Sequence, residues 1–90
     1  MAVVKVTLYA YLREKAGVDT LTLEADTFGK LLNLLDSRFP QLREYISQNS
    51  ARFKENIYLV NGRNIEFLNG LDTQLQDGDE VAIFPPVAGG

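Results

Sequence analysis

The sequence predicts an α+β domain in which one mixed sheet of four to five strands packs on one main helix. Apolar and polar residues alternate in the segments 3–11 and 20–24, as is typical of half-buried strands, and residues 81–84 (VAIF) form a short apolar run that predicts a further strand. In residues 27–39 the period changes to that of an amphipathic helix. The chain has 90 residues, so we expect one domain, too small to cover both faces of the sheet with helices.

The first two strands are predicted to form a hairpin. Residues 3–11 (VVKVTLYAY) alternate, which places four apolar residues on one face: Val4, Val6, Leu8 and Ala10. Residues 13–17 break the alternation and end at Gly17, which accommodates a positive φ, so they predict a turn or a short loop. Residues 20–24 alternate again, so Leu21 and Leu23 should face the core.

The main helix should begin near Thr27 and end before Pro40. Its apolar residues recur at helical spacing: Phe28, Leu31, Leu32, Leu35 and Phe39. Either Asp26 or Thr27 can cap the first turn, where Gly29 costs about 1 kcal/mol relative to alanine. Residues 41–54 show only partial helical spacing and predict a short helix followed by a loop.

A second hairpin is predicted beyond residue 56. Residues 57–60 (IYLV) form a compact apolar run, and the Asn61-Gly62 dipeptide that follows is a strong signal for a tight turn. We expect a short return strand at 65–68. The remaining elements are turns at 69–75, which should bring two leucines to the core, a turn at 77–80 and the last strand at 81–84.

Composition and charge exclude several functional classes. The chain has no cysteine and no histidine, which excludes disulfides, thiolate or imidazole metal sites and the usual nucleophile triads. Its net charge is −3 and its basic residues are scattered, so we expect no nucleic-acid partner. No long apolar run or leader pattern is present, so we expect no membrane partner and a cytoplasmic location. The acidic cluster at 77–80 matches no calcium-binding loop; we interpret it as a turn that can also steer a basic partner.

The last six residues, Pro85-Pro86-Val87-Ala88-Gly89-Gly90, carry the clearest functional signal. Two prolines favour an extended path away from the sheet, so we expect a domain at 1–84 and a flexible, projecting tail at 85–90. Two terminal glycines are narrow enough to enter a channel in another protein and to present the carboxylate of Gly90 there. The alternative is a frayed chain end at which small residues are tolerated.

Two segments resemble the MoaD-type small subunit of molybdopterin synthase, a sulfur carrier of the ubiquitin-like MoaD/ThiS family: residues 8–17 (LYAYLREKAG) and 75–90 (LQDGDEVAIFPPVAGG). The resemblance implies a β-grasp, ubiquitin-like fold. It implies that a MoeB-like adenylyltransferase, related to ubiquitin-activating enzymes, uses ATP to adenylate Gly90, and that a persulfide donor then converts the terminus to a thiocarboxylate. The large catalytic subunit (MoaE-type) would receive the tail and transfer its sulfur to a cyclic pterin precursor. The small subunit itself would bind no cofactor and would not catalyse the reaction alone.

The resemblance also implies a docking surface at the base of the tail. We expect the following residues to contact partner proteins: Tyr9, Phe84, Pro85, Pro86, Val87, Ala88 and Gly89. Alternation leaves open whether Phe84 faces a partner or the core, although exposed apolar clusters usually mark interaction sites. Ile65 and Phe67 are candidates to extend this surface. Arg13 and Glu14 match the family's loop, and a solvated pair beside a turn explains them structurally.

Other functions remain open at this stage. In a ubiquitin-like modifier, the activated Gly90 would form an isopeptide bond with lysines of target proteins. A ThiS-type carrier for thiamine thiazole synthesis would share the fold and the diglycine, although such proteins usually lack the Phe-Pro-Pro segment. An interaction domain with an idle tail is a further alternative. The carrier that the resemblance implies would serve either a molybdenum pathway or a tungsten pathway.

Overall fold

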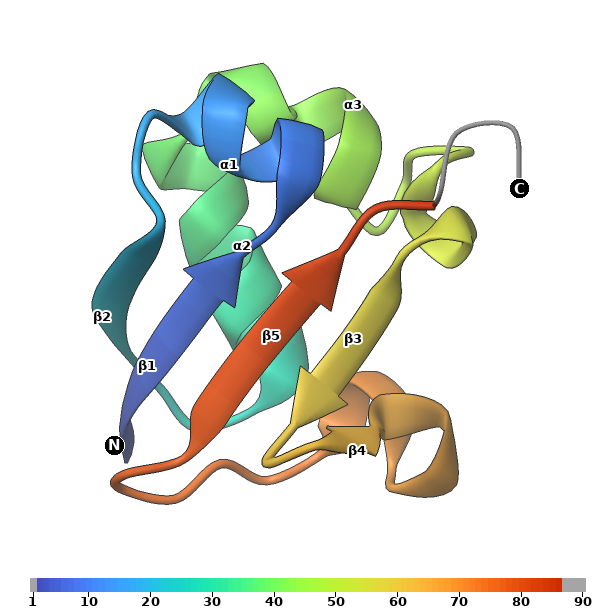
Figure 1. Ribbon diagram of the computed structural model, residues 1–90. Helices are drawn as coiled ribbons and strands as arrows, with labels where there is room; N and C mark the ends of the chain where they lie inside the picture. Colours follow the sequence, from blue (N-terminus) through green and yellow to red (C-terminus); the bar gives the residue numbers. More distant parts are fainter. Residues whose placement is uncertain (1, 87–90) are drawn as a thin grey trace.

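The computed structural model describes residues 2–86, and residues 1 and 87–90 lie outside the described part (Figure 1). Five strands form one sheet in the order β2-β1-β5-β3-β4. Their bounds are β1 Ala2–Leu8, β2 Thr20–Ala25, β3 Ile57–Val60, β4 Arg63–Asn64 and β5 Glu80–Phe84. The α-helices are α1 Ala10–Ala16, α2 Phe28–Arg38 and α3 Arg43–Ile46, and short 3₁₀ turns occupy Pro40–Leu42, Phe53–Glu55, Ile65–Phe67 and Gly70–Asp72.

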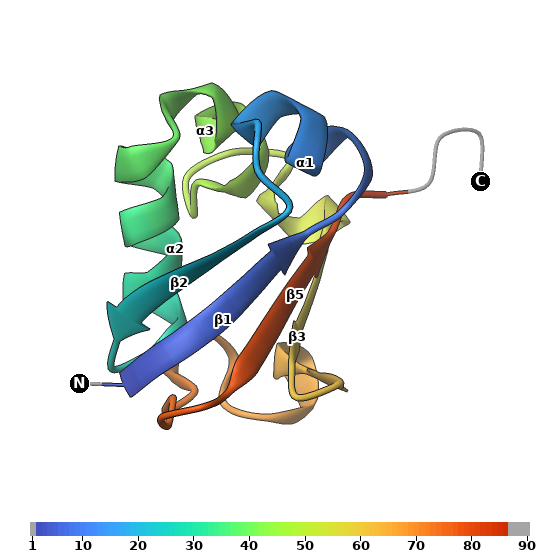
Figure 2. The same ribbon diagram turned by 60° about the vertical axis from the view of Figure 1, so that its left-hand side comes forward.

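Strand β5 lies at the centre of the sheet. It runs parallel to β1 and antiparallel to β3, while β1 and β2 pair antiparallel over six residues. Helix α2 packs across one face of the sheet (Figure 2). This arrangement confirms the predicted α+β, β-grasp fold and its antiparallel first pair of strands. No helix in residues 2–86 is long and apolar enough to cross a membrane.

The core forms where the inner face of the sheet meets α2. Strand alternation buries every second residue of the three middle strands, namely Val4, Val6 and Leu8 in β1, Tyr58 and Val60 in β3, and Val81 and Ile83 in β5. The predicted stripe of α2 packs against them, with Phe28, Leu31, Leu32 and Leu35 fully buried and Phe39 partly buried. The alternate residues of each strand therefore form a separate outer face.

The start of α2 combines a predicted cap with a close backbone approach. Thr27 is the N-cap, and its hydroxyl oxygen accepts a hydrogen bond from the Lys30 backbone N–H at 3.3 Å. A Cβ atom at Gly29 would lie 3.1 Å from the carbonyl oxygen of Leu71. Gly29 therefore lowers helix propensity but lets the Gly70–Asp72 turn approach α2 closely.

Two segments differ from the prediction. The first strand ends at Leu8 rather than at residue 11, and Ala10–Ala16 forms α1 where a turn or short loop was expected. Ala10 has a φ of +52°, which ends the extended path, and the helix places Leu12 in the core with no exposed surface. Gly17 ends α1 at a φ of +80°, as expected for a glycine there.

The predicted return strand at 65–68 is also wrong. Asn61 and Gly62 both have positive φ, so the turn holds two residues and directly pairs Val60 with Arg63. The return strand is therefore Arg63–Asn64, and Ile65–Phe67 forms a 3₁₀ turn.

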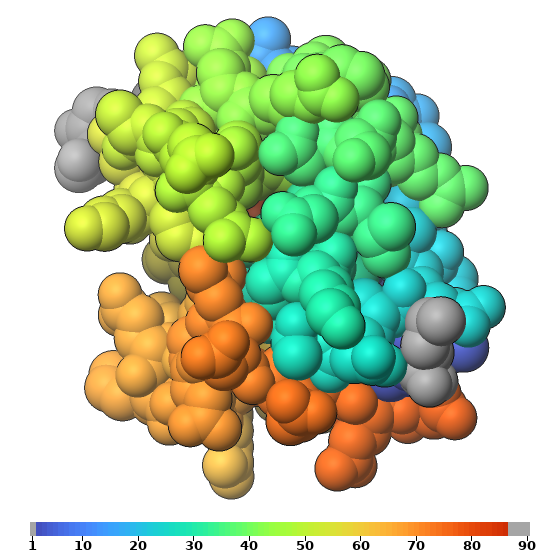
Figure 3. Space-filling view, turned by 180° about the vertical axis from the view of Figure 1, so that it is seen from behind, coloured from blue at the N-terminus to red at the C-terminus, as the bar shows by residue number. Residues whose placement is uncertain are grey.

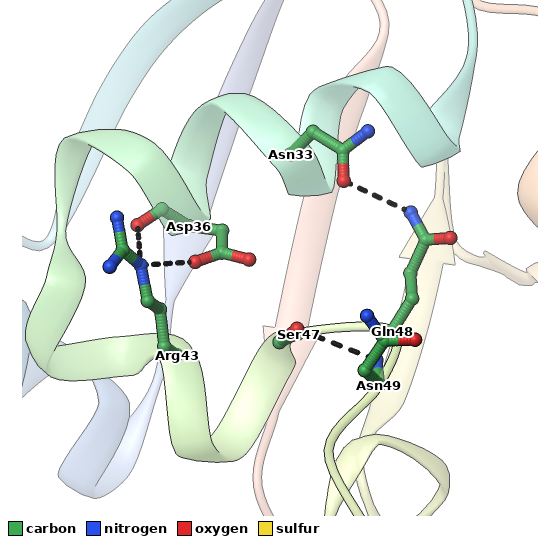
Figure 4. A network of polar contacts seen from close by, with 6 residues as sticks. All are labelled: Asn33, Asp36, Arg43, Ser47, Gln48 and Asn49. Atoms are coloured by element: carbon green, nitrogen blue, oxygen red, sulfur yellow. Dashed lines mark hydrogen bonds and ion pairs between the residues drawn. The ribbon is translucent and has the colours of Figure 1, made fainter.

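Polar contacts hold the α3 region against α2 (Figure 4). Arg43 Nε donates to the Asp36 carboxylate at 2.7 Å and to the Asp36 carbonyl oxygen at 3.2 Å. In the following loop, the Gln48 amide donates to the Gly29 carbonyl oxygen at 3.2 Å and to Asn33 Oδ1 at 3.3 Å. The short helix and loop expected at 41–54 are thereby confirmed and tied to the main helix.

Candidate tail-exit site

The chain leaves the sheet from its central strand. β5 ends at Phe84, Pro85 is buried and Pro86 is exposed. The Tyr9 N–H donates to the Ile83 carbonyl oxygen at 3.2 Å, so the end of β1 holds the end of β5 immediately before the prolines. The remaining predicted tail residues, Val87, Ala88, Gly89 and Gly90, lie outside the described residues, and their roles stay predictions.

Tyr9 and Phe84 form a stacked aromatic pair at this exit. Their ring centroids are 4.1 Å apart and the ring planes differ by 13°. Phe84 follows the buried Ile83 in an alternating strand, so its side chain lies on the outer face of the sheet, where it is half-buried. The structure thus brings two predicted site residues together and places Phe84 outside the core.

Sequence analysis missed that β3 extends this outer face. Ile57 is the register partner of Phe84, and Leu59 is the register partner of Ala82. Ile57 is 47% exposed, which makes it the most accessible of these side chains. We call Tyr9, Ile57, Leu59, Ala82 and Phe84 the tail-base patch. The inward residues Tyr58 and Val60 imply by alternation that Ile57 and Leu59 face outward, but only the strand order places them beside Phe84.

The outer face changes from apolar to charged along the strands. Phe84 and Ile57 lie at the tail end of β5 and β3, and Ala82 pairs with Thr7 one step further along. Lys5 and Glu80 are register partners at the opposite end of the β1–β5 pair. The apolar part of this face is therefore concentrated where the tail begins.

A buried hydrogen-bond network surrounds the start of β3, next to Ile57. The Asn56 side-chain amide donates to the Tyr45 carbonyl oxygen at 2.7 Å and to the Tyr58 hydroxyl at 3.0 Å. The Tyr58 hydroxyl donates to the Phe53 carbonyl oxygen at 2.8 Å. Burial raises the pKa of Tyr58 from 10.0 to about 12, although the Asn56 hydrogen bond acts in the opposite direction. These bonds fix the start of β3 and so the position of Ile57.

The two candidates for an extended surface are not part of the patch. Ile65 is 5% exposed and belongs to the core, so the prediction that it extends the surface is wrong. Phe67 is 84% exposed, but its 3₁₀ turn follows β4, at the end of β3 away from Phe84 (Figure 1). Arg13 lies in α1 and pairs with Asp19 at 3.6 Å, an exposed contact that explains it structurally.

The acidic segment at 77–80 is a turn, as predicted. Two of its carboxylates accept hydrogen bonds, mainly from backbone N–H groups. Asp77 accepts a hydrogen bond from the Val3 N–H at 2.8 Å, and Asp79 accepts from the Gln76 N–H at 2.8 Å and from the Asn61 amide at 2.9 Å. Gly78 provides the positive φ of the turn. Within residues 2–86, no cluster of acidic side chains has the arrangement of a metal site.

Comparison with known proteins connects this geometry to a family. A profile described as the ThiS family matches residues 6–90. The chain is 34% identical to small archaeal modifier protein 3 of Haloferax volcanii, covering 91% of this chain and 92% of that protein. It is 34% identical to the molybdopterin synthase sulfur carrier subunit of Escherichia coli, covering 97% and 99%.

A solved structure agrees with the fold. The small archaeal modifier protein 1 of Methanosarcina acetivorans superposes with a TM-score of 0.89 at 39% identity, covering 100% of this chain and 98% of that one. The match to the family profile begins within β1 and covers all the later strands, α2 and the terminal segment of the sequence. The chain therefore belongs to the ThiS family of ubiquitin-like sulfur carriers, which includes relatives of the MoaD type.

Proposed function

We propose that this protein carries sulfur as a thiocarboxylate on Gly90 and donates it for molybdopterin synthesis. The observation that carries the proposal is the position of the tail: it begins directly beyond the central strand, beside the tail-base patch. A partner that docks on the patch receives the residues that follow Pro86. The similarity to a molybdopterin synthase sulfur carrier subunit supports this acceptor pathway.

The chemistry needs activation by a partner because a terminal carboxylate is ionised at neutral pH and is a poor electrophile. An adenylyltransferase of the MoeB-like kind transfers AMP from ATP to the Gly90 carboxylate and releases pyrophosphate. Hydrosulfide, or the terminal sulfur of a persulfide, then attacks the acyl carbon and AMP leaves. With hydrosulfide the product is directly the thiocarboxylate; a persulfide donor first gives an acyl disulfide, which a second thiol of the donor reduces. The chain has no cysteine, so the terminus is the place on it for the carried sulfur.

We further propose that the tail-base patch is the docking surface for both the adenylyltransferase and the MoaE-type large subunit. Its side chains are half-buried or exposed and come from β3, from β5 and from Tyr9 just beyond the end of β1, which places apolar side chains side by side near Pro86. Apolar patches of this kind mark protein interaction sites, and buried aromatic residues commonly dominate binding energy there.

Intact-mass spectrometry tests the carrier chemistry. The full chain is incubated with ATP, a matching adenylyltransferase and sulfide, and we expect replacement of one terminal oxygen by sulfur. The change should be absent in the variant that lacks Gly90. A full mass shift in that variant, or no shift with an adenylyltransferase shown to be active, would contradict the proposal.

A protein-modifier function is the second candidate, favoured by the similarity to small archaeal modifier protein 3. Both functions begin with adenylation of Gly90, and they differ in the acceptor. Sulfur transfer to a pterin precursor by the reconstituted synthase supports the first function. Lysine-linked conjugates that disappear when Gly90 is removed support the second. A ThiS-type role predicts instead that the thiocarboxylate supplies sulfur in thiazole synthesis.

A further inference from the structure

The two edges of the sheet differ in how they are protected. β4 forms one edge and has only two residues, Arg63–Asn64. β2 forms the other edge and pairs with β1 in an uninterrupted register over six residues, with no bulge. Natural edge strands are commonly protected by short length, proline, charged side chains, especially lysine, or a bulge. The sequence of β2, TLTLEA, contains no proline or lysine, and its one charged residue is Glu24.

Alternate backbone groups of β2 point away from β1. The Leu8 N–H donates to the Asp19 carbonyl oxygen at 2.9 Å, and the same register pairs Val6 with Leu21. Every second residue of an antiparallel pair exchanges hydrogen bonds with its partner, so Leu21 and Leu23 bond to β1. The residues that direct their N–H and C=O groups to the open edge are Thr20, Thr22 and Glu24.

A groove of about 410 Å³ lies between this edge and α2. Its lining includes Glu24 and Ala25 from β2, and Lys30, Leu34 and Ser37 from α2. Leu34 is 41% exposed, in contrast to the buried leucines of the α2 stripe. Figure 3 shows the exposed surface of α2 in teal and green, with the cyan residues of β2 beside it. The groove therefore combines an accessible leucine with an open strand edge.

The charge at the groove is acidic. Glu24 makes no hydrogen bond or ion pair with any residue in the range 2–86, and its register partner on β1 is the uncharged Val3. Lys30 lies 3.7 Å from Asp26, so that cation already faces a carboxylate. A cationic side chain on a strand added next to β2 would lie opposite Glu24, in the cross-strand position that favours opposite charges.

We propose that the groove between β2 and α2 binds an extended segment of another protein as an added strand in which aliphatic and basic residues alternate. The outward backbone groups of Thr20, Thr22 and Glu24 would pair with the segment, as in other cases of strand addition. Its aliphatic side chains would point toward α2 and cover Leu34, and its basic side chains would lie on the outer face beside Glu24. Because β1 separates β2 from β5, such binding leaves the tail accessible.

Nuclear magnetic resonance with a synthetic probe tests the proposal on the full chain. The probe is a short capped peptide in which valine and lysine alternate. In the free protein, the amides of Thr20, Thr22 and Glu24 should exchange with solvent faster than those of Leu21 and Leu23. The peptide should slow exchange at these three amides, and a peptide that alternates valine with glutamate should not.

Three variants and one matched control locate the binding. Thr22→Pro removes an outward N–H without removing a bond to β1, and should weaken peptide binding about tenfold, while Thr22→Val keeps that N–H and should bind as the wild type does. Glu24→Lys should reverse the preference between the two peptides. Leu34→Ser changes an exposed side chain, so it should preserve folding and still weaken binding.

Two outcomes would overturn the proposal. One is peptide binding that neither Leu34→Ser nor Glu24→Lys changes. The other is protection of the three edge amides in the free protein that increases with protein concentration, since the edge would then pair with a second copy of the chain.

Discussion

The rings of Tyr9 and Phe84 stack at a centroid distance of 4.1 Å across the β1–β5 pair, immediately before the chain leaves the sheet. Tyr9 lies between β1 and α1, and Phe84 is the last residue of β5. The stack thus joins the first segment of the fold to the base of the tail. It links the geometry of the exit to the outer surface on which we propose that partners dock.

Phe84→Ala should weaken binding to the MoaE-type large subunit. The substitution removes the central aromatic side chain of the tail-base patch, and we expect at least about a tenfold loss of affinity in isothermal titration calorimetry. Loss of the stack should also lower the free energy of unfolding by about 1 kcal/mol.

Phe67→Ala is the matched control for that experiment. It removes an aromatic ring that is 84% exposed and lies away from the patch, so affinity should not change. An equal loss of affinity in both variants, or no loss in Phe84→Ala, would contradict the docking proposal.

Extending the chain beyond Gly90 by one residue should abolish thiocarboxylate formation. The added residue displaces the glycine carboxylate from the position at which the adenylyltransferase acts. The core is built from residues between Ala2 and Ile83, so the melting temperature should match that of the wild type. Intact-mass spectrometry and a thermal melt check the two parts. A thiocarboxylate formed on the extended chain would show that Gly90 is not the required terminus.

Stability should decrease at alkaline pH through Tyr58. Its pKa is raised from 10.0 to about 12 by burial, so the folded state binds the phenolic proton more tightly than the unfolded state does. The resulting contribution to the free energy of unfolding is fully present below pH 10 and is lost as the pH rises through about 12. Denaturant unfolding over this range measures the loss.

Tyr58→Phe should abolish the part of the alkaline loss of stability that comes from ionisation of Tyr58. At neutral pH the same variant should be less stable than the wild type by about 1 kcal/mol, since it loses the hydrogen bonds that the Tyr58 hydroxyl makes with Phe53 and Asn56. Tyr11→Phe provides a matched control because it also removes one tyrosine hydroxyl. The interpretation fails if Tyr58→Phe and the wild type lose stability in parallel above pH 10.

Gly29→Ala should destabilise the fold although alanine favours helices. The gain in helix propensity is about 1 kcal/mol. Opposing it, the added Cβ would lie 3.1 Å from the Leu71 carbonyl oxygen. Leu71 belongs to the Gly70–Asp72 turn. This turn is held close to α2 because the next residue, Thr73, accepts a hydrogen bond at its carbonyl oxygen from the Phe28 N–H at 3.0 Å. Overpacking costs about 1–3 kcal/mol, so we expect a net loss in denaturant unfolding.

Ser37→Ala measures the effect of helix propensity without any overpacking against Leu71. Ser37 is exposed on the same helix, and its replacement should stabilise the protein slightly. If Gly29→Ala stabilises the protein as Ser37→Ala does, the close approach of Leu71 does not constrain the helix.

Local patterns in the sequence were sufficient for the main elements. Alternation assigned the inner residues of β1 and β2, and the helical stripe assigned the buried face of α2. Residues 81–84 are recognisable as a strand, but their uniformly apolar sequence leaves the inner face of β5 open. The same reasoning failed at residues 10–16. There an alternating run and a short helix both place Leu12 inward, and the positive φ of Ala10 that selects the helix has no signature in the residue type.

What the sequence by itself determined is what depends on neighbouring residues: the inner faces of β1 and β2, the limits of α2, the Asn61-Gly62 turn, and a chain ending in Pro-Pro and Gly-Gly. Only the tertiary structure decided which strands are neighbours. The pairing of β5 with both β1 and β3 brings Tyr9, Phe84 and Ile57 onto one surface, and it leaves β2 as an open edge beside α2. The physical reason is that periodicity specifies which side of an element is buried, whereas long-range packing specifies what lies next to it.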